Sequence, residues 1–250
     1  MTTAAEIRKW TRAIASSRDD VVLRGRFLFM IPIRHVIRGV AFPGSWDKTL
    51  PRPYWFVATT VTPPAGSFGG KWRGNLDVGR SNEPGFSEIL DFHLNRAIEE
   101  ELAPLETIEA FYAAAATRNR PAPVHGNWER LQHFPANHAA VLAALGRLEE
   151  AGSEASAFVD KYELLWQQRL LTGEAMMASR RTRGMGRDEV EFASHQLALV
   201  DYAKSLASLA ASGKKAEVVS LLRDWERTNI HRWKLELAWE PTPFPLERDL

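Results

Sequence analysis

The sequence predicts an α+β protein, with a small antiparallel sheet near the N-terminus packed with a larger α-helical segment. Two patterns support this prediction. Residues 21–62 are rich in branched and aromatic side chains, with polar residues at near-alternate positions, which is typical of strands. From Phe86 onwards, apolar residues recur every three to four positions, which is typical of helices. The composition, 45% hydrophobic and 25% charged, is that of a packed globular chain.

In the first part of the chain, a short amphipathic helix is expected to precede the strands. Its apolar residues Ile7, Trp10 and Ile14 share one side of a helix over residues 2–17. Proline has no N–H group for a strand ladder, so Pro32 marks an edge or a break between two short strands. The predicted strands cover residues 21–33, 35–42 and 54–62, with room for a fourth near 75–78.

In the remainder of the chain, the apolar period predicts a series of helices. Pro104 separates the first two of them, because proline ends or kinks a helix. The proline-containing residues 118–128 form an expected linker, which divides the chain into regions 1–120 and 121–250 unless it forms one continuous domain. Residues 230–239 fit a helix or a strand, and their alternating apolar residues favour a strand that precedes an extended tail. The predicted helices cover residues 86–102, 104–117, 136–150, 153–179, 188–212 and 214–229.

The composition excludes several classes of function. The chain has no cysteine, which excludes a disulfide framework, a thiolate zinc site, an iron–sulfur cluster and a cysteine nucleophile. The net charge of +1 does not indicate a nucleic-acid or acidic-lipid partner. The N-terminus has no apolar block, and the apolar run at 27–33 is far shorter than a membrane helix. We therefore expect a cytoplasmic protein without a membrane partner.

Motifs for catalysis or cofactor binding are also missing from the sequence. Lys71 follows two glycines without the spacing of a phosphate-binding loop, and neither a GxSxG nor an HExxH motif occurs. His125, His133 and His138 have the right side chain for zinc but match no ligand spacing. We expect no cofactor and no metal. An enzyme with a scattered site, built from His35, Asp91 and His93, stays open as a third hypothesis.

Two resemblances concern the layout of the chain rather than its chemistry. Residues 143–162 and 205–225 resemble tetratricopeptide hairpins, although the turn glycines Gly152 and Gly213 are not one repeat length apart, which favours generic hairpins. Residues 34–42, followed by the Tyr-Trp-Phe-Val of residues 54–57, resemble the N-terminal part of a group of uncharacterised bacterial proteins with a helical remainder. The second resemblance implies the same β-then-α layout and no site.

Tryptophan–arginine pairs in the expected loops are the candidate partner-binding residues. Large aromatic and arginine side chains are the types that dominate the binding energy of protein interfaces. The three pairs are Trp46 with Arg52, Trp72 with Arg73, and Trp128 with Arg130. These pairs, together with the helical hairpins, predict a non-catalytic protein-interaction protein of adaptor, immunity or assembly type, whose protein partner is unidentified.

Two groups of basic residues are candidate anion-binding sites. Arg34 and Arg38 fall on the opposite side of a strand from His35, because side chains alternate along a strand. A second group lies between two predicted helices, where arginine forks could bind phosphate groups, so a nucleic-acid-associated protein is the second hypothesis. The members of the second group are Arg180, Arg181, Arg183 and Arg187.

Overall fold

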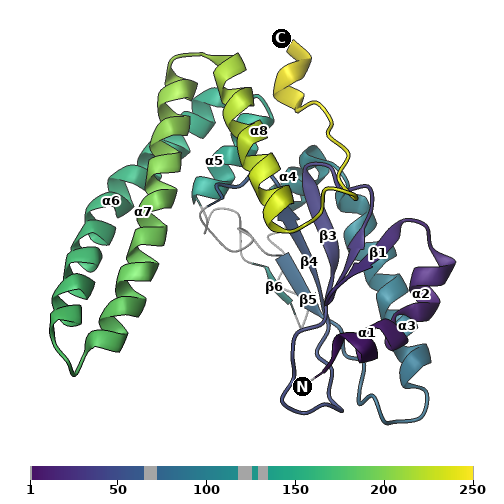
Figure 1. The fold of residues 1–250 in the computed structure, drawn as a ribbon. Helices are drawn as coiled ribbons and strands as arrows, with labels where there is room; N and C mark the ends of the chain where they lie inside the picture. Colours follow the sequence, from purple (N-terminus) through teal and green to yellow (C-terminus); the bar gives the residue numbers. More distant parts are fainter. Residues whose placement is uncertain (1, 65–71, 118–125, 129–134, 250) are drawn as a thin grey trace. The chain divides into compact units, whose positions relative to one another are not determined.

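The computed structural model describes residues 2–64, 72–117, 126–128 and 135–249. Within these residues the chain has the predicted α+β fold, with an antiparallel sheet and a larger helical part (Figure 1). The chain divides into two compact units. The sheet unit comprises Met1–Thr60, Gly70–Arg130 and Ile230–Thr242, and the helical unit comprises Val61–Gly69, Leu131–Asn229 and Pro243–Leu250. The predicted boundary at residue 120 lies outside the described residues.

The sheet has six strands that pair antiparallel in chain order. Gly25 has a φ of 61°, the conformation that a tight hairpin turn between Arg24 and Phe27 requires. Residues predicted as linker supply the last strand, whose three residues pair with the strand before it. The strands are β1 (Val21–Arg24), β2 (Phe27–Met30), β3 (Val36–Ala41), β4 (Tyr54–Thr59), β5 (Trp72–Asn75) and β6 (Gly126–Trp128).

The helices of the sheet unit are interrupted at positions that the apolar spacing of the sequence does not show. The predicted helix over 2–17 is two helices, because Thr11 lies between them and its hydroxyl donates to Ile7 O at 2.9 Å. The helical path through 86–105 changes from α to π at Ala97 and then to 3-10 around Pro104. The elements are α1 (Ala4–Trp10), α2 (Arg12–Ser17), α3 (Phe86–Arg96), the π-helix η1 (Ala97–Leu102), the 3-10 helix η2 (Ala103–Leu105) and α4 (Ile108–Thr117).

The core of the sheet unit lies on both faces of the sheet. On one face, Phe27 and Phe29 contact the ring of Phe56 at centroid distances of 5.9 and 6.0 Å. Trp233 adds an edge contact to Phe27 at 6.2 Å. Trp55 lies in register with Gly74, where a Cβ atom would be 2.3 Å from the indole nitrogen, so a glycine is required beneath this ring.

The C-terminal segment differs from the predicted strand and tail. The helix α8 (Lys215–Arg232) continues past residue 229, and Trp239 then forms an isolated parallel bridge with Ile33. Ile33 N–H donates to Ala238 O, and Glu240 N–H donates to Ile33 O, both at 2.8 Å. The expected strand over 230–239 is therefore wrong. The tail is not fully extended either, since the 3-10 helix η4 covers Pro245–Asp249.

The helical unit contains α5 (Pro135–Ala144), α6 (Leu148–Ala178), α7 (Arg183–Ala211) and most of α8. Gly146 and Gly213 make the turns before α6 and before α8, with φ values of 82° and 67°. Gly152, the predicted turn glycine, instead lies inside α6. None of the helices in the described part of the chain is both long and apolar enough to cross a membrane.

An ion pair after α2 is expected to make stability depend on pH. Arg18 donates to both oxygens of Asp20 at 2.8 Å, and these hydrogen bonds lower the pKa of Asp20. A lowered folded-state pKa adds stability above the unfolded value, and that stability is lost as the pH falls through the folded pKa. The variant Asp20→Asn should therefore be less stable than the wild type at pH 7 and should lose less stability on acidification below about pH 4.

The measurement for Asp20→Asn is urea unfolding of both proteins at a series of pH values. Asp19→Asn, one residue earlier in the chain, is the matched control. If the two variants change the pH profile equally, the pairing with Arg18 is not the cause.

Candidate binding surface on the helical hairpin

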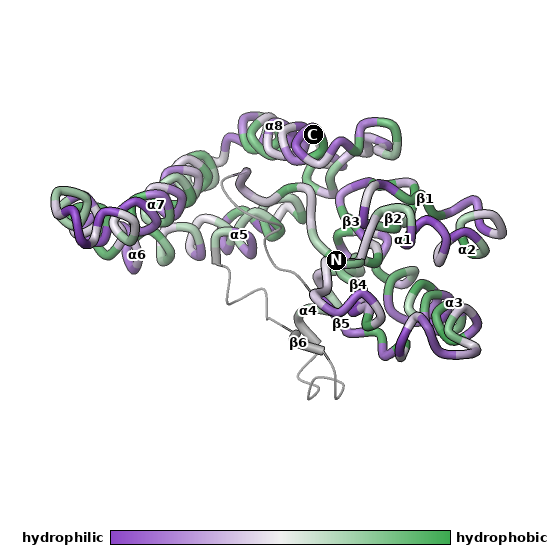
Figure 2. Tube along the Cα trace, turned by 60° about the horizontal axis from the view of Figure 1, so that its bottom comes forward, coloured by the Kyte–Doolittle hydropathy of each residue, from purple (hydrophilic) through white to green (hydrophobic). Residues whose placement is uncertain are grey.

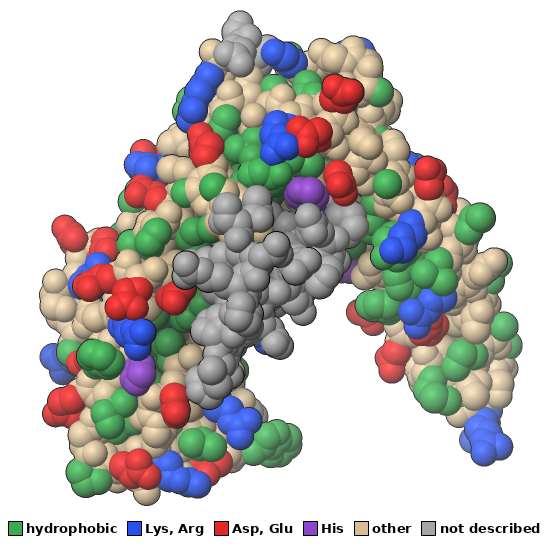
Figure 3. Space-filling model, turned by 180° about the vertical axis from the view of Figure 1, so that it is seen from behind, with side chains coloured by type: hydrophobic (Ala, Val, Ile, Leu, Met, Phe, Trp, Pro, Cys, Tyr) green, Lys and Arg blue, Asp and Glu red, His purple; other side chains and the backbone are tan. Residues whose placement is uncertain are grey.

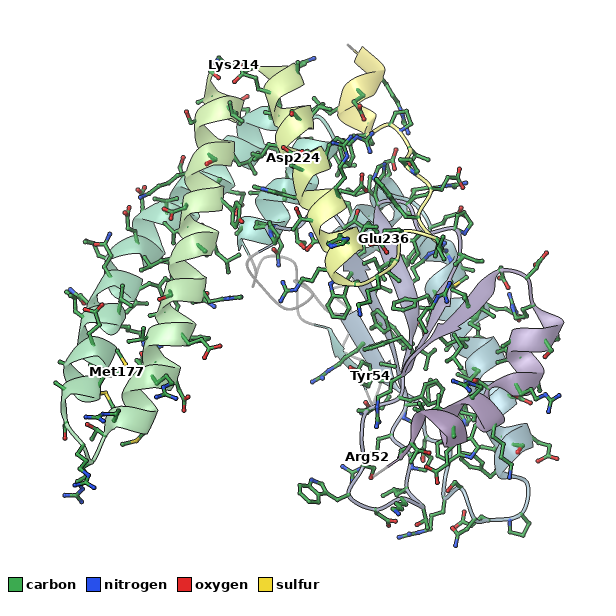
Figure 4. All side chains as sticks on the ribbon, viewed as in Figure 1. Arg52, Tyr54, Met177, Lys214, Asp224 and Glu236 are labelled. Carbon is green, nitrogen blue, oxygen red and sulfur yellow. The ribbon has the colours of Figure 1, made fainter. Side chains whose placement is uncertain are left out.

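The helices α6 and α7 form a long antiparallel hairpin (Figure 1). Their 31 and 29 residues correspond to about 45 Å of helix, whereas α5 and α8 have 10 and 18 residues. A hydrogen bond to the last turn of α6 closes the hairpin turn, because Thr182 Oγ1 donates to Met176 O at 2.8 Å. At the start of α7, Gly186 N–H donates to Thr182 O at 2.9 Å. Figure 4 labels Met177 beside this turn, at the opposite end of α7 from Lys214.

Small residues line the seam between the two helices. A Cβ atom on Gly186 would lie 2.7 Å from the carbonyl oxygen of Gly173 and 2.7 Å from the nitrogen of Met177. Further along the seam, Gly152 faces the Cβ atom of Ala210, and Ala155 and other alanines are fully buried. Because the backbones approach this closely, the seam has little room for large side chains.

An apolar stripe runs along α7 at every seventh residue, and we call it the α7 stripe: Leu206, Leu199, Phe192 and Met185. Leu206 is 1% exposed and Leu199 is half-buried, whereas Phe192 and Met185 are 48% and 58% exposed. The buried end lies where α8 packs on α7, shown by the ring contact between Tyr202 and Trp225 at 5.5 Å. Towards the turn, the same stripe continues as the half-exposed Phe192 and Met185.

An aromatic and cationic cluster lies beside Phe192. The rings of Phe158, Tyr162 and Trp166 contact one another in sequence along α6, and Trp166 meets Phe192 edge to face at 5.5 Å. The guanidinium of Arg169 lies 5.1 Å from the Trp166 ring centroid and 5.5 Å from that of Phe192. Arg169 also donates to both carboxylate oxygens of Glu189, at 2.5 and 3.1 Å. These contacts hold Trp166, Arg169 and Phe192 in place at a half-exposed surface. Aromatic and arginine side chains are the types that contribute most to the binding energy of protein interfaces.

The outer side of α6 adds a second pair of exposed apolar residues. Leu164 and Leu171, which are seven residues apart, are 69% and 64% exposed. Their spacing places both leucines on one side of the helix. Figure 2 shows hydrophobic and hydrophilic residues interleaved along both helices up to the far end of the hairpin.

The turn of the hairpin and the first residues of α7 carry four exposed arginines, which we call the tip arginines: Arg180, Arg181, Arg183 and Arg187. Within the described part of the chain, no carboxylate lies within ion-pair distance of any of them. Arg169 and Lys204, which lie farther from the turn, each pair with a glutamate. Arg183 Nε donates to Met177 O at 3.4 Å, and this hydrogen bond leaves its charge unbalanced. Figure 3 shows basic side chains beside hydrophobic ones on this arm, with a basic group at its end.

The predicted tryptophan–arginine pairs are only partly described. Trp46 is fully exposed in the loop before β4, and Arg52 is exposed in the same loop. Arg73 is exposed on β5, with its guanidinium 5.9 Å from the ring centroid of Tyr54. The backbone register of β5 and β6 pairs Trp72 with Trp128. Arg130 lies outside the described residues.

Of the first predicted group of anion-binding residues, Arg38 lies on β3, and Arg34 and His35 directly precede this strand. Arg34 pairs with Glu106 at 2.6 Å and with Glu240 at 3.5 Å, so its charge is balanced by carboxylates. Arg38 is 3% exposed and donates to the carbonyl oxygens of Leu102 and Ala103. His35 Nε2 lies 3.1 Å from Thr242 Oγ1. Both arginines therefore already have partners within the protein.

Of the three residues in the scattered-site hypothesis, His35 directly precedes β3, whereas Asp91 and His93 lie on α3. Burial raises the pKa of Asp91, with a smaller contribution from Glu88. The described chain contains no group of three histidine, aspartate or glutamate side chains placed to hold a metal. Of the three histidines considered for zinc, His138 lies on α5 at 3.7 Å from Glu154. His125 and His133 lie outside the described residues.

Comparisons of the chain with protein-family models, with curated proteins and with solved structures find no match. The site therefore has to be interpreted from its own residues.

The sequence did not predict the hairpin surface, because an apolar period does not show which apolar residues are buried. A signal was present in the exact seven-residue spacing of Met185, Phe192, Leu199 and Leu206. Such spacing is typical of a helix that packs along one partner helix. The lengths of α5 and α8 decide how much of that stripe is buried within the chain. The spacing of residues in α7 does not show those lengths.

Proposed function

We propose that this protein is a non-catalytic protein-interaction protein, of the adaptor, immunity or assembly type expected for a bacterial cytoplasm. Its contact surface is the outer half of the α6–α7 hairpin. The observation that carries this proposal is the α7 stripe, which is buried at Leu206 and exposed at Phe192 and Met185. An apolar stripe that continues beyond its own cover is typical of a helix that receives a partner.

The chemistry of the surface specifies the partner. The apolar residues of the α7 stripe are suited to an amphipathic helix that continues along α7 beyond the end of α8. The tip arginines have no carboxylate partner within the described chain, so they favour a partner helix with acidic residues where it reaches the turn. Trp166, Arg169 and Phe192 form the half-exposed centre of the contact. The proposed partner is therefore a protein with an amphipathic helix, apolar on one side and acidic near one end.

The tip arginines also favour a second candidate function, which is binding of nucleic acid. Four arginines on a turn at the end of a long hairpin could contact phosphate groups bidentately. Around these arginines the exposed side chains include Met185 but no ring that could stack on a base. This candidate predicts strong salt dependence and no dependence on Phe192.

The experiment compares capture of partners by the tagged wild-type protein and by the double variant Met185→Asp, Phe192→Asp, both from the native host. We expect one stoichiometric protein with the wild type and its loss with the double variant. With the purified partner, the single variant Phe192→Asp should weaken binding by about 30-fold or more, as for a hot-spot residue. Binding is measured by isothermal titration calorimetry after nuclease treatment.

The matched control is Phe92→Asp, which changes an exposed phenylalanine of α3 in the sheet unit. It should leave partner binding unchanged. A protein captured equally by the wild type and by the double variant would overturn the proposal. Retention that disappears after nuclease treatment, and that depends on the tip arginines, would favour the nucleic-acid candidate instead.

A further inference from the structure

An open hollow lies on the surface of the sheet unit, against α1, α2 and β1. Its volume is about 580 Å³, within the range of small-molecule sites. Ala5, Ala15 and Leu23 give it small and apolar lining, and Thr11 and Ser16 contribute to the wall. Three cationic residues, Arg8, Lys9 and Arg12, complete the lining. The hollow is independent of the hairpin surface.

The three cationic residues line the same hollow, and no carboxylate balances their charge within the described chain. Arg8 and Arg12 are four residues apart along α1 and α2, a spacing at which like charges repel each other on a helix. All three side chains are exposed, and within the described chain no carboxylate lies within ion-pair distance of them. Four other arginines of the unit differ in this respect, since Arg18, Arg34, Arg80 and Arg96 each have a carboxylate partner.

Glu6, the acidic residue nearest to these cations in the sequence, already has hydrogen-bond partners. Glu6 accepts hydrogen bonds from Thr3 N at 2.7 Å and Thr3 Oγ1 at 2.8 Å, and it forms a capping box with that residue. The hydrogen bonds from Thr3 lower the pKa of Glu6, so its carboxylate stays ionised on the cap. The charge of Arg8, Lys9 and Arg12 is therefore available to a bound anion.

The helices that carry these cations are held in place by the core. Ile7 and Ile14 are 0% and 2% exposed, and Trp10 meets Phe86 of α3 edge to face at 5.4 Å. The hydrogen bond from Thr11 Oγ1 to Ile7 O fixes the joint between α1 and α2. The backbone beneath the cations is thus preorganised, and binding needs to order only the side chains.

We propose that this hollow binds a phosphate-bearing molecule, whose phosphate lies between Arg8 and Arg12 and whose remaining part rests against Leu23 and the alanines. Guanidinium groups match phosphate oxygens bidentately, and the ammonium of Lys9 adds a third positive charge. The size of the hollow fits a small phosphorylated metabolite. A phospholipid headgroup presents the same chemistry, so the experiment distinguishes these two sources.

The experiment titrates inorganic pyrophosphate into the full-length protein at low salt, by isothermal titration calorimetry and by NMR chemical shifts. We compare the wild type with the double variant Arg8→Gln, Arg12→Gln and with the control Arg24→Gln. Arg24 is an exposed arginine of β1 that does not line the hollow. We expect at least about a tenfold loss of affinity in the double variant and no change in the control.

A parallel arm measures co-flotation with vesicles of phosphatidylcholine containing about one third phosphatidylserine. Binding of pyrophosphate but not of vesicles assigns the hollow to a soluble ligand, and vesicle binding lost in the double variant assigns it to a headgroup. Equal affinities of the wild type and the double variant in both arms would overturn the proposal. No binding of pyrophosphate at millimolar concentration together with no flotation would overturn it as well.

Discussion

Replacing Arg38 by alanine is expected to lower the free energy of unfolding by about 3 kcal/mol, from the loss of a buried donor and the cavity left behind. Arg38 is 3% exposed, and its Nη1 donates to Leu102 O and to Ala103 O, each at 3.3 Å. These carbonyls lie where the π-helix η1 passes into η2. Burial lowers the pKa of Arg38, and the carboxylate of Glu106 opposes this effect. The guanidinium therefore stabilises the helical junction despite the cost of its desolvation.

Urea unfolding followed by circular dichroism tests this prediction, with two comparison variants. Arg38→Met keeps most of the side-chain volume but removes the donors, so it should recover only part of the loss. Arg24→Ala, at an exposed position of β1, should change stability by no more than about 0.5 kcal/mol. If Arg38→Met is as stable as the wild type, the hydrogen bonds to the junction contribute nothing net and our account is wrong.

Replacing Gly186 by alanine is expected to destabilise the end of the hairpin by about 2 kcal/mol, as for an overpacked core position. The new methyl group would lie 2.7 Å from Gly173 O and 2.7 Å from Met177 N, and both are backbone atoms. Backbone atoms cannot rotate away, so α6 and α7 would have to separate near the turn. Separation there would also disturb the Thr182–Met176 hydrogen bond that closes the turn.

Gly184→Ala is the matched control, two residues away on the same helix. A Cβ atom at Gly184 meets nothing within 4 Å, so the substitution should leave stability unchanged or raise it by up to about 1 kcal/mol through helix propensity. Hydrogen exchange of the amides near the turn, together with thermal unfolding, measures both variants. Faster exchange in Gly184→Ala than in Gly186→Ala would contradict the close approach of the two helices.

Local patterns in the sequence were sufficient for the fold class and for most elements. The alternation in residues 21–42 and 54–62 corresponds to β1 to β4, and the apolar period after Phe86 corresponds to the helices. These patterns depend on contacts between residues near each other in the chain. Gly152 was misplaced at a turn because a glycine inside a helix gives the same local signal as one at its end. The structure shows its reason, which is the close approach to Ala210.

The candidate sites were harder to predict than the elements. Arg34 was predicted as an anion-binding residue, but its carboxylate partners Glu106 and Glu240 are 72 and 206 residues away in the sequence. The sequence does not show such pairings. An arginine that pairs with a distant carboxylate therefore cannot be distinguished, from the sequence, from one without a carboxylate partner. The hollow beside Arg8 and Arg12 could not be predicted for the same reason, since its lining also needs Leu23 of β1.

The sequence by itself determined that this chain is an α+β protein without cysteine chemistry, because composition and periodicity are properties of single segments. It also determined the seven-residue stripe of α7. The tertiary structure alone decided which part of that stripe is exposed, which arginines have partners, and that residues 126–128 join a sheet begun a hundred residues earlier. Burial and pairing depend on elements that are distant in the chain, and the pattern of one segment does not specify what covers it.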